Sequence, residues 1–170
     1  MTQTAGCRNF RVAWLAASVA LSALPVAAQP APAPTVPVAS TPAGYDEALA
    51  RRLGADDMGM RGYVLVVLKT GPNRMPDGPE RDAMFRDHFA NIKRLADEGK
   101  LALAGPFDGV DGWRGLFVFA VKDIEEARRL TATDPVIVKG EMVAEFHRYY
   151  GSAALMLVPE SHDKVAKKRF

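Results

Sequence analysis

The chain has 170 residues, of which 48% are hydrophobic and 25% are charged, and this composition is that of one folded domain with an extension. Lys and Arg total 22 while Asp and Glu total 20, so the chain lacks the strong positive charge that a dedicated nucleic-acid-binding surface needs. Its one cysteine, Cys7, excludes an intramolecular disulfide, a cysteine zinc site and a CxxC redox site.

Residues 1–28 have the three-part pattern of a secretory signal peptide. Two arginines precede an apolar stretch over residues 12–23, and small residues at 26–28 fit a signal peptidase site. Pro25 interrupts the apolar stretch before it reaches the roughly 20 residues that a membrane span needs. We therefore expect export to the periplasm or out of the cell, with cleavage after Ala28 and no membrane span in the mature chain.

The following segments differ from one another in composition. Residues 29–44 are rich in Pro and Ala, which prevents a helix or a sheet ladder and predicts an extended spacer. Apolar residues recur with helical spacing over Tyr45–Leu53, so residues 45–61 are predicted to hold a short leading helix and a connection. Residues 62–150 then carry the folded domain, and residues 151–170 are a C-terminal tail whose polar end we expect to be exposed to solvent.

Two kinds of hydrophobic pattern alternate within the folded domain. Apolar residues recur every three or four positions in two predicted helices, over residues 79–98 and from Asp123 to Leu130. Short apolar runs predict four strands, at residues 63–68, 101–107, 113–121 and 141–150. The order strand, helix, strand, strand, helix, strand predicts a ferredoxin-like βαββαβ sandwich of the α+β class, in which both helices cover one face of the sheet.

The opposite face of this sheet would be polar if the protein were a monomer. The sequence predicts an apolar face instead, because Phe117 and Phe119 alternate with Leu116 and Val118 along one strand. The strand at residues 63–68 is also apolar on both faces. We therefore predict a homodimer in which the two sheets pack face to face.

His88 is the residue that points most directly to chemistry. It lies four residues after Met84 and four before Ile92, so it falls on the apolar stripe of its helix that faces the sheet. One interpretation is a core histidine that hydrogen-bonds a backbone carbonyl. The other is a general acid or base at the edge of a pocket beneath the helix.

Asp134 is the natural companion of His88, although the spacing of the two residues does not establish a contact. Pro135 follows Asp134 and ends the second helix, because the residue before a proline is pushed out of helical geometry. One interpretation is that Asp134 caps the short turn over residues 135–140. The other is that its carboxylate reaches His88 and fixes the tautomer of the imidazole.

The remaining candidates have weaker signals. Gly105 and Pro106 end the second strand, where they either let a ligand approach the backbone closely or simply terminate the strand. His147 and His162 have no recognisable metal-ligand spacing with His88. The chain has no GxGxxG, phosphate-loop or GxSxG motif, so we expect no metal and no cofactor.

Three motifs in this order make the chain resemble the YCII-related family over Tyr63–Tyr150. The helical histidine of that family is matched in RDHFANI, residues 86–92. The segment EGKLALAGP, residues 98–106, resembles the family's strand entry, and TDP, residues 133–135, resembles its aspartate–proline turn. The family consists of dimeric α/β-barrel proteins, so the resemblance implies such a barrel here, in an exported branch of the family.

The resemblance further implies that His88 and Asp134 form an active-site dyad that moves protons on a small organic molecule, in lyase- or isomerase-type chemistry. Relatives act on hydroxylated aromatics and small cyclic metabolites, and nothing in the sequence selects one substrate. Arg86 lies one position closer to the histidine than the family's arginine and, with Gly105 and Pro106, is a candidate for binding the ligand. The alternative is a non-catalytic ligand-binding or assembly module with the same barrel.

Overall fold

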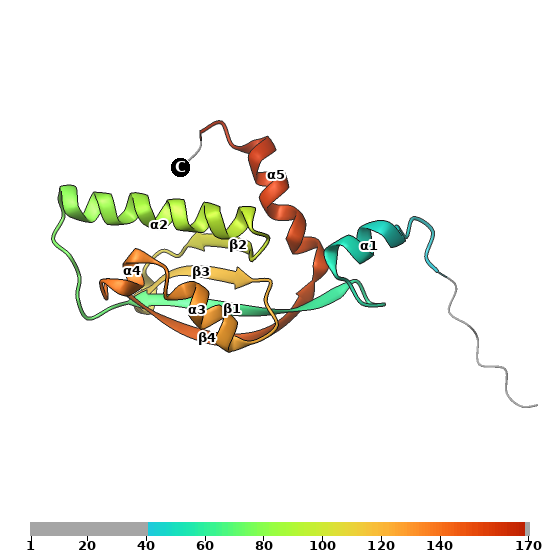
Figure 1. Ribbon diagram of the computed structural model, residues 1–170, viewed down its shortest axis with the longest axis horizontal. Helices are drawn as coiled ribbons and strands as arrows, with labels where there is room; N and C mark the ends of the chain where they lie inside the picture. Colours follow the sequence, from blue (N-terminus) through green and yellow to red (C-terminus); the bar gives the residue numbers. More distant parts are fainter. Residues whose placement is uncertain (1–40, 169–170) are drawn as a thin grey trace, which may run out of the picture. The chain divides into compact units, whose positions relative to one another are not determined.

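A computed structural model describes residues 41–168, so the predicted signal peptide and residues 29–40 of the predicted spacer lie outside the described residues. The strands form one antiparallel sheet in the order β2-β3-β1-β4 (Figure 1). Their bounds are β1 Met60–Thr70, β2 Leu101–Pro106, β3 Trp113–Phe119 and β4 Met142–Ser152. The sheet and its helices confirm the predicted α+β class and are consistent with a ferredoxin-like fold.

The helices α1, α2 and α3 begin and end close to the predicted positions, whereas α4 and α5 lie in segments that were predicted as a turn and a tail. Their bounds are α1 Glu47–Leu53, α2 Pro79–Asp97, α3 Ile124–Thr131, α4 Pro135–Val138 and α5 Val158–Val165, with short 3-10 helices η1 Val110–Gly112 and η2 Ala153–Leu157. Gly54 ends α1 in the left-handed conformation, at a φ of 68°. The side chain of Asp123 accepts a hydrogen bond from the backbone N–H of Glu126 at 2.8 Å and so caps the start of α3.

The hydrophobic core lies between the sheet and the helices α2, α3 and α4. It contains alternate residues of β1 and β3 together with the inner side chains of the helices, namely Val64, Val66, Leu68, Met84, Leu95, Phe117, Phe119, Ala127 and Val136. Because side chains alternate along a strand, the residues between them point to the opposite face. The buried stripe of α2 therefore faces the sheet, as its spacing predicts.

The opposite face of the sheet is partly covered by the chain's own C-terminal segment. The 3-10 helix η2 places Leu155 and Met156 against Tyr63, Ala102 and Val118. These three residues are buried by this contact and by their neighbours in the sheet. The chain itself therefore covers part of this face, for which the sequence predicted a second copy as the cover.

The predicted C-terminal tail has regular secondary structure over most of its length. Its first two residues, Gly151 and Ser152, continue β4, and η2 and α5 follow directly. The side chains of residues 160–165 are exposed, as expected for the polar end of the tail. The tail thus combines a docked apolar part with a solvent-exposed helix.

The part of the helix-free face that belongs to β4 remains open. Val143 and Tyr149 are 44% and 39% exposed, which is a large fraction for side chains of this kind on a sheet. Between them, Glu145 accepts hydrogen bonds from Lys69 Nζ and, at 2.8 Å, from His147 Nε2. The homodimer on this face stays a prediction.

Candidate functional site

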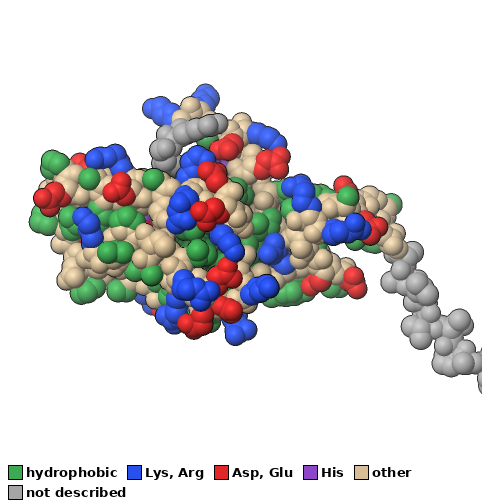
Figure 2. Space-filling view, viewed as in Figure 1, with side chains coloured by type: hydrophobic (Ala, Val, Ile, Leu, Met, Phe, Trp, Pro, Cys, Tyr) green, Lys and Arg blue, Asp and Glu red, His purple; other side chains and the backbone are tan. Residues whose placement is uncertain are grey.

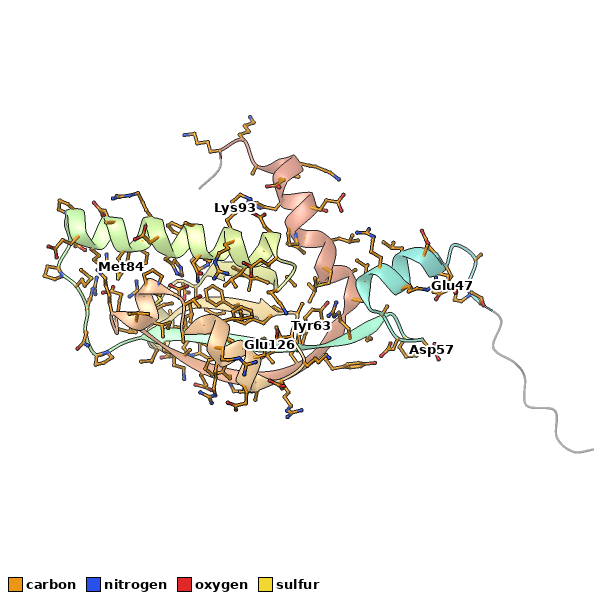
Figure 3. The ribbon with its side chains drawn as sticks, in the orientation of Figure 1. Glu47, Asp57, Tyr63, Met84, Lys93 and Glu126 are labelled. Atoms are coloured by element: carbon orange, nitrogen blue, oxygen red, sulfur yellow. The ribbon has the colours of Figure 1, made fainter. Side chains whose placement is uncertain are left out.

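The buried stripe of α2 carries two polar residues among its apolar ones. Met84, His88, Asn91 and Leu95 are its buried side chains, and Met84 is labelled in Figure 3 at the start of the stripe. Only 7% of His88 is exposed. A titratable side chain at such a position needs a polar partner, because an unpaired buried polar group is costly.

The partner of His88 is Asp134. The Nδ1 atom of His88 lies 2.8 Å from both Oδ1 and Oδ2 of Asp134, and the aspartate is fully buried. A buried carboxylate is tolerated only when it is hydrogen-bonded or paired. The two residues that the sequence singles out are therefore in direct contact.

Asp134 reaches this position because it is also the N-cap of α4. Its Oδ1 accepts a hydrogen bond from the backbone N–H of Val136 at 3.1 Å, and Pro135 occupies the first helical position. The backbone N–H of Asp134 donates to the carbonyl of Thr131 at 3.0 Å, which closes the turn after α3. Asp134 therefore caps the short turn and contacts His88 at the same time, so the two interpretations of this residue are compatible.

The contact assigns the tautomer of the imidazole. A carboxylate only accepts hydrogen bonds, so Nδ1 must carry the proton that it donates to Asp134. In the neutral imidazole this leaves a lone pair on Nε2. Within the described residues Nε2 has no hydrogen-bond partner. It is nevertheless not completely shielded from solvent. Nε2 is thus the nitrogen that can take up a proton from another molecule.

Aromatic side chains surround the imidazole. The ring of Phe85 meets it edge-on at 6.0 Å between centroids, Phe89 lies at 5.3 Å, and Phe117 of β3 lies nearly parallel to it at 6.1 Å. These rings restrict the access of water to the pair. A polar interaction in such surroundings is stronger than the same interaction in water.

A second fully buried carboxylate, Glu141, lies on the same side of the sheet and was not singled out from the sequence. Its Oε1 accepts hydrogen bonds from Arg81 Nε at 3.2 Å and Nη2 at 2.7 Å, and its Oε2 accepts one from the backbone N–H of Met75 at 2.7 Å. Burial raises the pKa of Glu141, but the hydrogen bonds from Arg81 and Met75 outweigh burial, so the net pKa is lowered. Glu141 therefore remains ionised and fixes the start of α2.

The other ligand-binding candidates are exposed residues. Gly105 and Pro106 form the exposed end of β2, and a Cβ added at Gly105 would meet nothing within 4 Å. Arg86 lies on the exposed side of α2. Among the described residues, no hydrogen bond or ion pair joins any of these three to His88 or Asp134.

The remaining histidines lie at separate places. His147 bonds Glu145 on the helix-free face, and His162 is on the exposed helix α5. In the part of the chain that the structure describes, no three His, Cys, Asp or Glu side chains are grouped so that they could hold a metal ion. Over the same residues, no helix combines the length and apolar composition that crossing a bilayer requires.

Two open hollows on the surface of residues 41–168 are not lined by the His88–Asp134 pair. One of about 470 Å³ lies on α2, where Lys93 is labelled in Figure 3, and the other of about 400 Å³ lies on α5. In Figure 2, the Lys and Arg side chains of the visible face alternate with Asp and Glu and form no extended basic patch. The pair itself lies beneath α2.

A family model described as YCII-related domain matches residues 63–146. The match begins in β1 and ends in β4, and it includes both His88 and Asp134. No curated protein matches the chain.

Proposed function

Because residues 63–146 form a YCII-related domain, we propose that the protein is an exported member of the YCII-related family whose His88 and Asp134 transfer protons to and from a small organic molecule. One observation carries this proposal. His88 Nδ1 is held at 2.8 Å by both oxygens of a fully buried carboxylate, while Nε2 has no partner among the described residues. This is the arrangement of a base that is oriented by an acidic residue.

The chemistry follows from the two ring nitrogens. Nε2 accepts a proton from an acidic C–H or O–H group of the ligand, and the resulting imidazolium is stabilised by the negative charge of Asp134. Return of the proton to a different ligand atom completes an isomerisation, whereas departure of a leaving group completes an elimination. Hydrolysis through a covalent intermediate is less well supported, because no described Ser or Thr side chain hydrogen-bonds His88.

A homodimer is the second element of the proposal. The support is the open part of the helix-free face, where Val143 and Tyr149 are exposed beside the Lys69–Glu145–His147 cluster. Exposed apolar side chains such as Val143 and Tyr149 are stabilised when another surface covers them. The docked η2 leaves β4 uncovered, so the second copy would pack mainly over β4 and the neighbouring part of β1.

Export is the third element, and it is supported by sequence alone. The three-part pattern of residues 1–28 predicts cleavage after Ala28. N-terminal sequencing of the protein recovered from the periplasmic fraction of cells that express the full chain is expected to begin at Gln29. Recovery of an unprocessed chain from the cytoplasm alone would contradict this element.

A non-catalytic role is favoured by one observation. His88 is only 7% exposed, so a single copy gives a ligand limited access to Nε2. In that case the protein would bind a ligand or assemble with itself, and the His88–Asp134 pair would stabilise the junction of α2 and α4.

Deuterium incorporation separates these two functions without knowledge of the substrate. The purified protein is incubated in D₂O with a panel of small carbonyl compounds and phenols, and exchange of each C–H group is followed by NMR. Proton transfer by His88 predicts that exchange in at least one compound is accelerated by roughly a hundredfold or more. This acceleration should be lost in His88→Gln and kept in His162→Gln, a matched change on exposed α5. Equal exchange in wild type and His88→Gln across the panel would favour the non-catalytic role.

A further inference from the structure

Two buried acidic residues flank α4, and each contacts α2. Asp134 precedes the helix and pairs with His88, and Glu141 follows it and pairs with Arg81. The spacing is seven residues on both segments. Seven residues of an α-helix are about two turns and roughly 10 Å, so Arg81 and His88 project from the same side of α2. The segment 134–141 therefore holds α2 at two points.

The second of these points is rigid. Arg81 donates two hydrogen bonds to one oxygen of Glu141 and, through Nη1, a third to Asp77 Oδ1 at 3.1 Å. Only 16% of the Arg81 side chain is exposed. A guanidinium held by several charge-assisted hydrogen bonds has few other positions available to it.

The backbone of the segment that carries Glu141 also holds the loop that precedes α2. The backbone N–H groups of Gly71 and Asn73 donate to the carbonyls of Glu141 and Gly140, at 2.9 Å and 3.0 Å. Gly71 has no space for a side chain, because a Cβ there would lie 2.1 Å from the carbonyl oxygen of Gly140. The loop therefore lies directly against the segment that carries Glu141, and the start of α2 cannot shift without breaking this contact.

Phe85 connects the Glu141–Arg81 pair to the imidazole. The Cζ atom of Arg81 lies 4.8 Å from the centroid of the Phe85 ring, within the range of a cation–π interaction. The same ring also meets His88, edge-on at 6.0 Å between centroids. A continuous series of contacts thus runs from Glu141 through Arg81 and Phe85 to His88.

We propose that Glu141 and Arg81 are positioning residues for His88. They hold the first two turns of α2 and the Phe85 ring in place. As a result, the protonated Nδ1 keeps its hydrogen bond to Asp134, and the lone pair of Nε2 stays at a fixed position. This inference rests on the proposed function, because the position of Nε2 matters only if that atom exchanges a proton with a ligand. Neither Glu141 nor Arg81 needs to contact the ligand.

The experiment measures the imidazole itself. The protein has three histidines, so a long-range ¹H–¹⁵N spectrum of the full chain is simple, and His88→Gln identifies the signals of His88. Glu141→Gln removes the charge but keeps an amide oxygen for Met75, and Arg81→Lys keeps the charge but loses the planar donor group. The matched control is Glu126→Gln, which breaks the 2.7 Å ion pair with Lys100 on another part of the domain.

Positioning predicts that the exchange of the His88 Nδ1 proton with water accelerates roughly tenfold or more in Glu141→Gln and in Arg81→Lys, relative to Glu126→Gln at matched stability. It also predicts a change in the two ring ¹⁵N shifts, which a role in stability alone would not produce. Unchanged shifts and exchange in both variants, or loss of the fold in both, would overturn the inference and assign the ion pair to stability. If the exchange of the His88 Nδ1 proton and the ring ¹⁵N shifts are the same in the wild type and in Asp134→Asn, the dyad and with it the proposed function fail instead.

Discussion

The Nδ1 atom of His88 is equidistant, at 2.8 Å, from the two carboxylate oxygens of Asp134, although the residues are 46 positions apart in the chain. The contact joins the middle of α2 to the turn between α3 and α4. It satisfies a polar group on each side of a buried junction, so it contributes to stability whether or not the protein is an enzyme. A role of this contact in catalysis depends on the other ring nitrogen, Nε2.

The first prediction concerns the stability of this pair. Asp134→Asn keeps an oxygen that can cap α4 but loses the negative charge that accepts from His88. We expect the free energy of unfolding to fall by about 2–3 kcal/mol, measured by urea denaturation at pH 7. Asp123→Asn is the matched control, because Asp123 caps α3 without a histidine partner, and its effect should stay below about 0.5 kcal/mol. Equal effects of the two substitutions would mean that the contact with His88 adds nothing.

The second prediction concerns the pH dependence of stability. The pKa of Glu141 is lowered in the folded protein, so its ion pair with Arg81 contributes above the unfolded pKa of about 4.3 and is lost as pH falls through the lower folded value. At pH 7, Glu141→Gln should lower the free energy of unfolding by about 3 kcal/mol. At pH 3 the wild type and the variant should differ much less. A difference that stays constant between these pH values would show that the carboxylate charge is not the cause.

The third prediction concerns the homodimer. Val143→Glu places a charge on the open part of the helix-free face, where the side chain is 44% exposed and its replacement costs the monomer little. We expect sedimentation velocity to show a dimer for the wild type and at least a tenfold weaker association for this variant. Val138→Glu, an exposed change on α4, serves as the control and should leave the association unchanged. A wild type that sediments as a monomer at micromolar concentration would contradict the proposed dimer.

The fourth prediction concerns the docked C-terminal segment. Leu155 and Met156 are partly buried against Tyr63, Ala102 and Val118, so replacing both with alanine removes apolar contacts from that face. The free energy of unfolding should fall by about 1–2 kcal/mol, which is less than for fully buried side chains. Val165→Ala on exposed α5 should have almost no effect. A double variant as stable as the wild type would show that the segment is not docked in solution.

The elements of the domain could be predicted from the sequence because each depends on a local pattern. The helical spacing of apolar residues placed α2 within one residue of its observed bounds, and the same spacing placed His88 on its buried side. The strand β1 is longer than its apolar run, because Met60–Gly62 pair with Tyr150–Ser152 through backbone hydrogen bonds that need no apolar side chain. Backbone pairing of this kind leaves little trace in the sequence.

Contacts between residues that are far apart in the chain were harder to predict from the sequence. The contact of His88 with Asp134 was one of two interpretations of the sequence and was further implied by the family resemblance, since a separation of 46 positions carries no periodic signal. Glu141 was missed because an acidic residue at the start of a strand is usually exposed, and its burial depends on Arg81 from another element. The docking of η2 was missed for a similar reason. Its apolar side chains pack against residues of the sheet that are distant in the chain, and they form no helical periodicity of their own.

The ring ¹⁵N chemical shifts of His88 in the wild-type protein at pH 7–8 show whether His88 donates from Nδ1 and keeps the lone pair on Nε2. We expect a protonated Nδ1 and an unprotonated Nε2, with both signals altered by Asp134→Asn. The reverse tautomer, with the proton on Nε2 and no response to Asp134→Asn, would contradict it and leave His88 as a packing residue of α2.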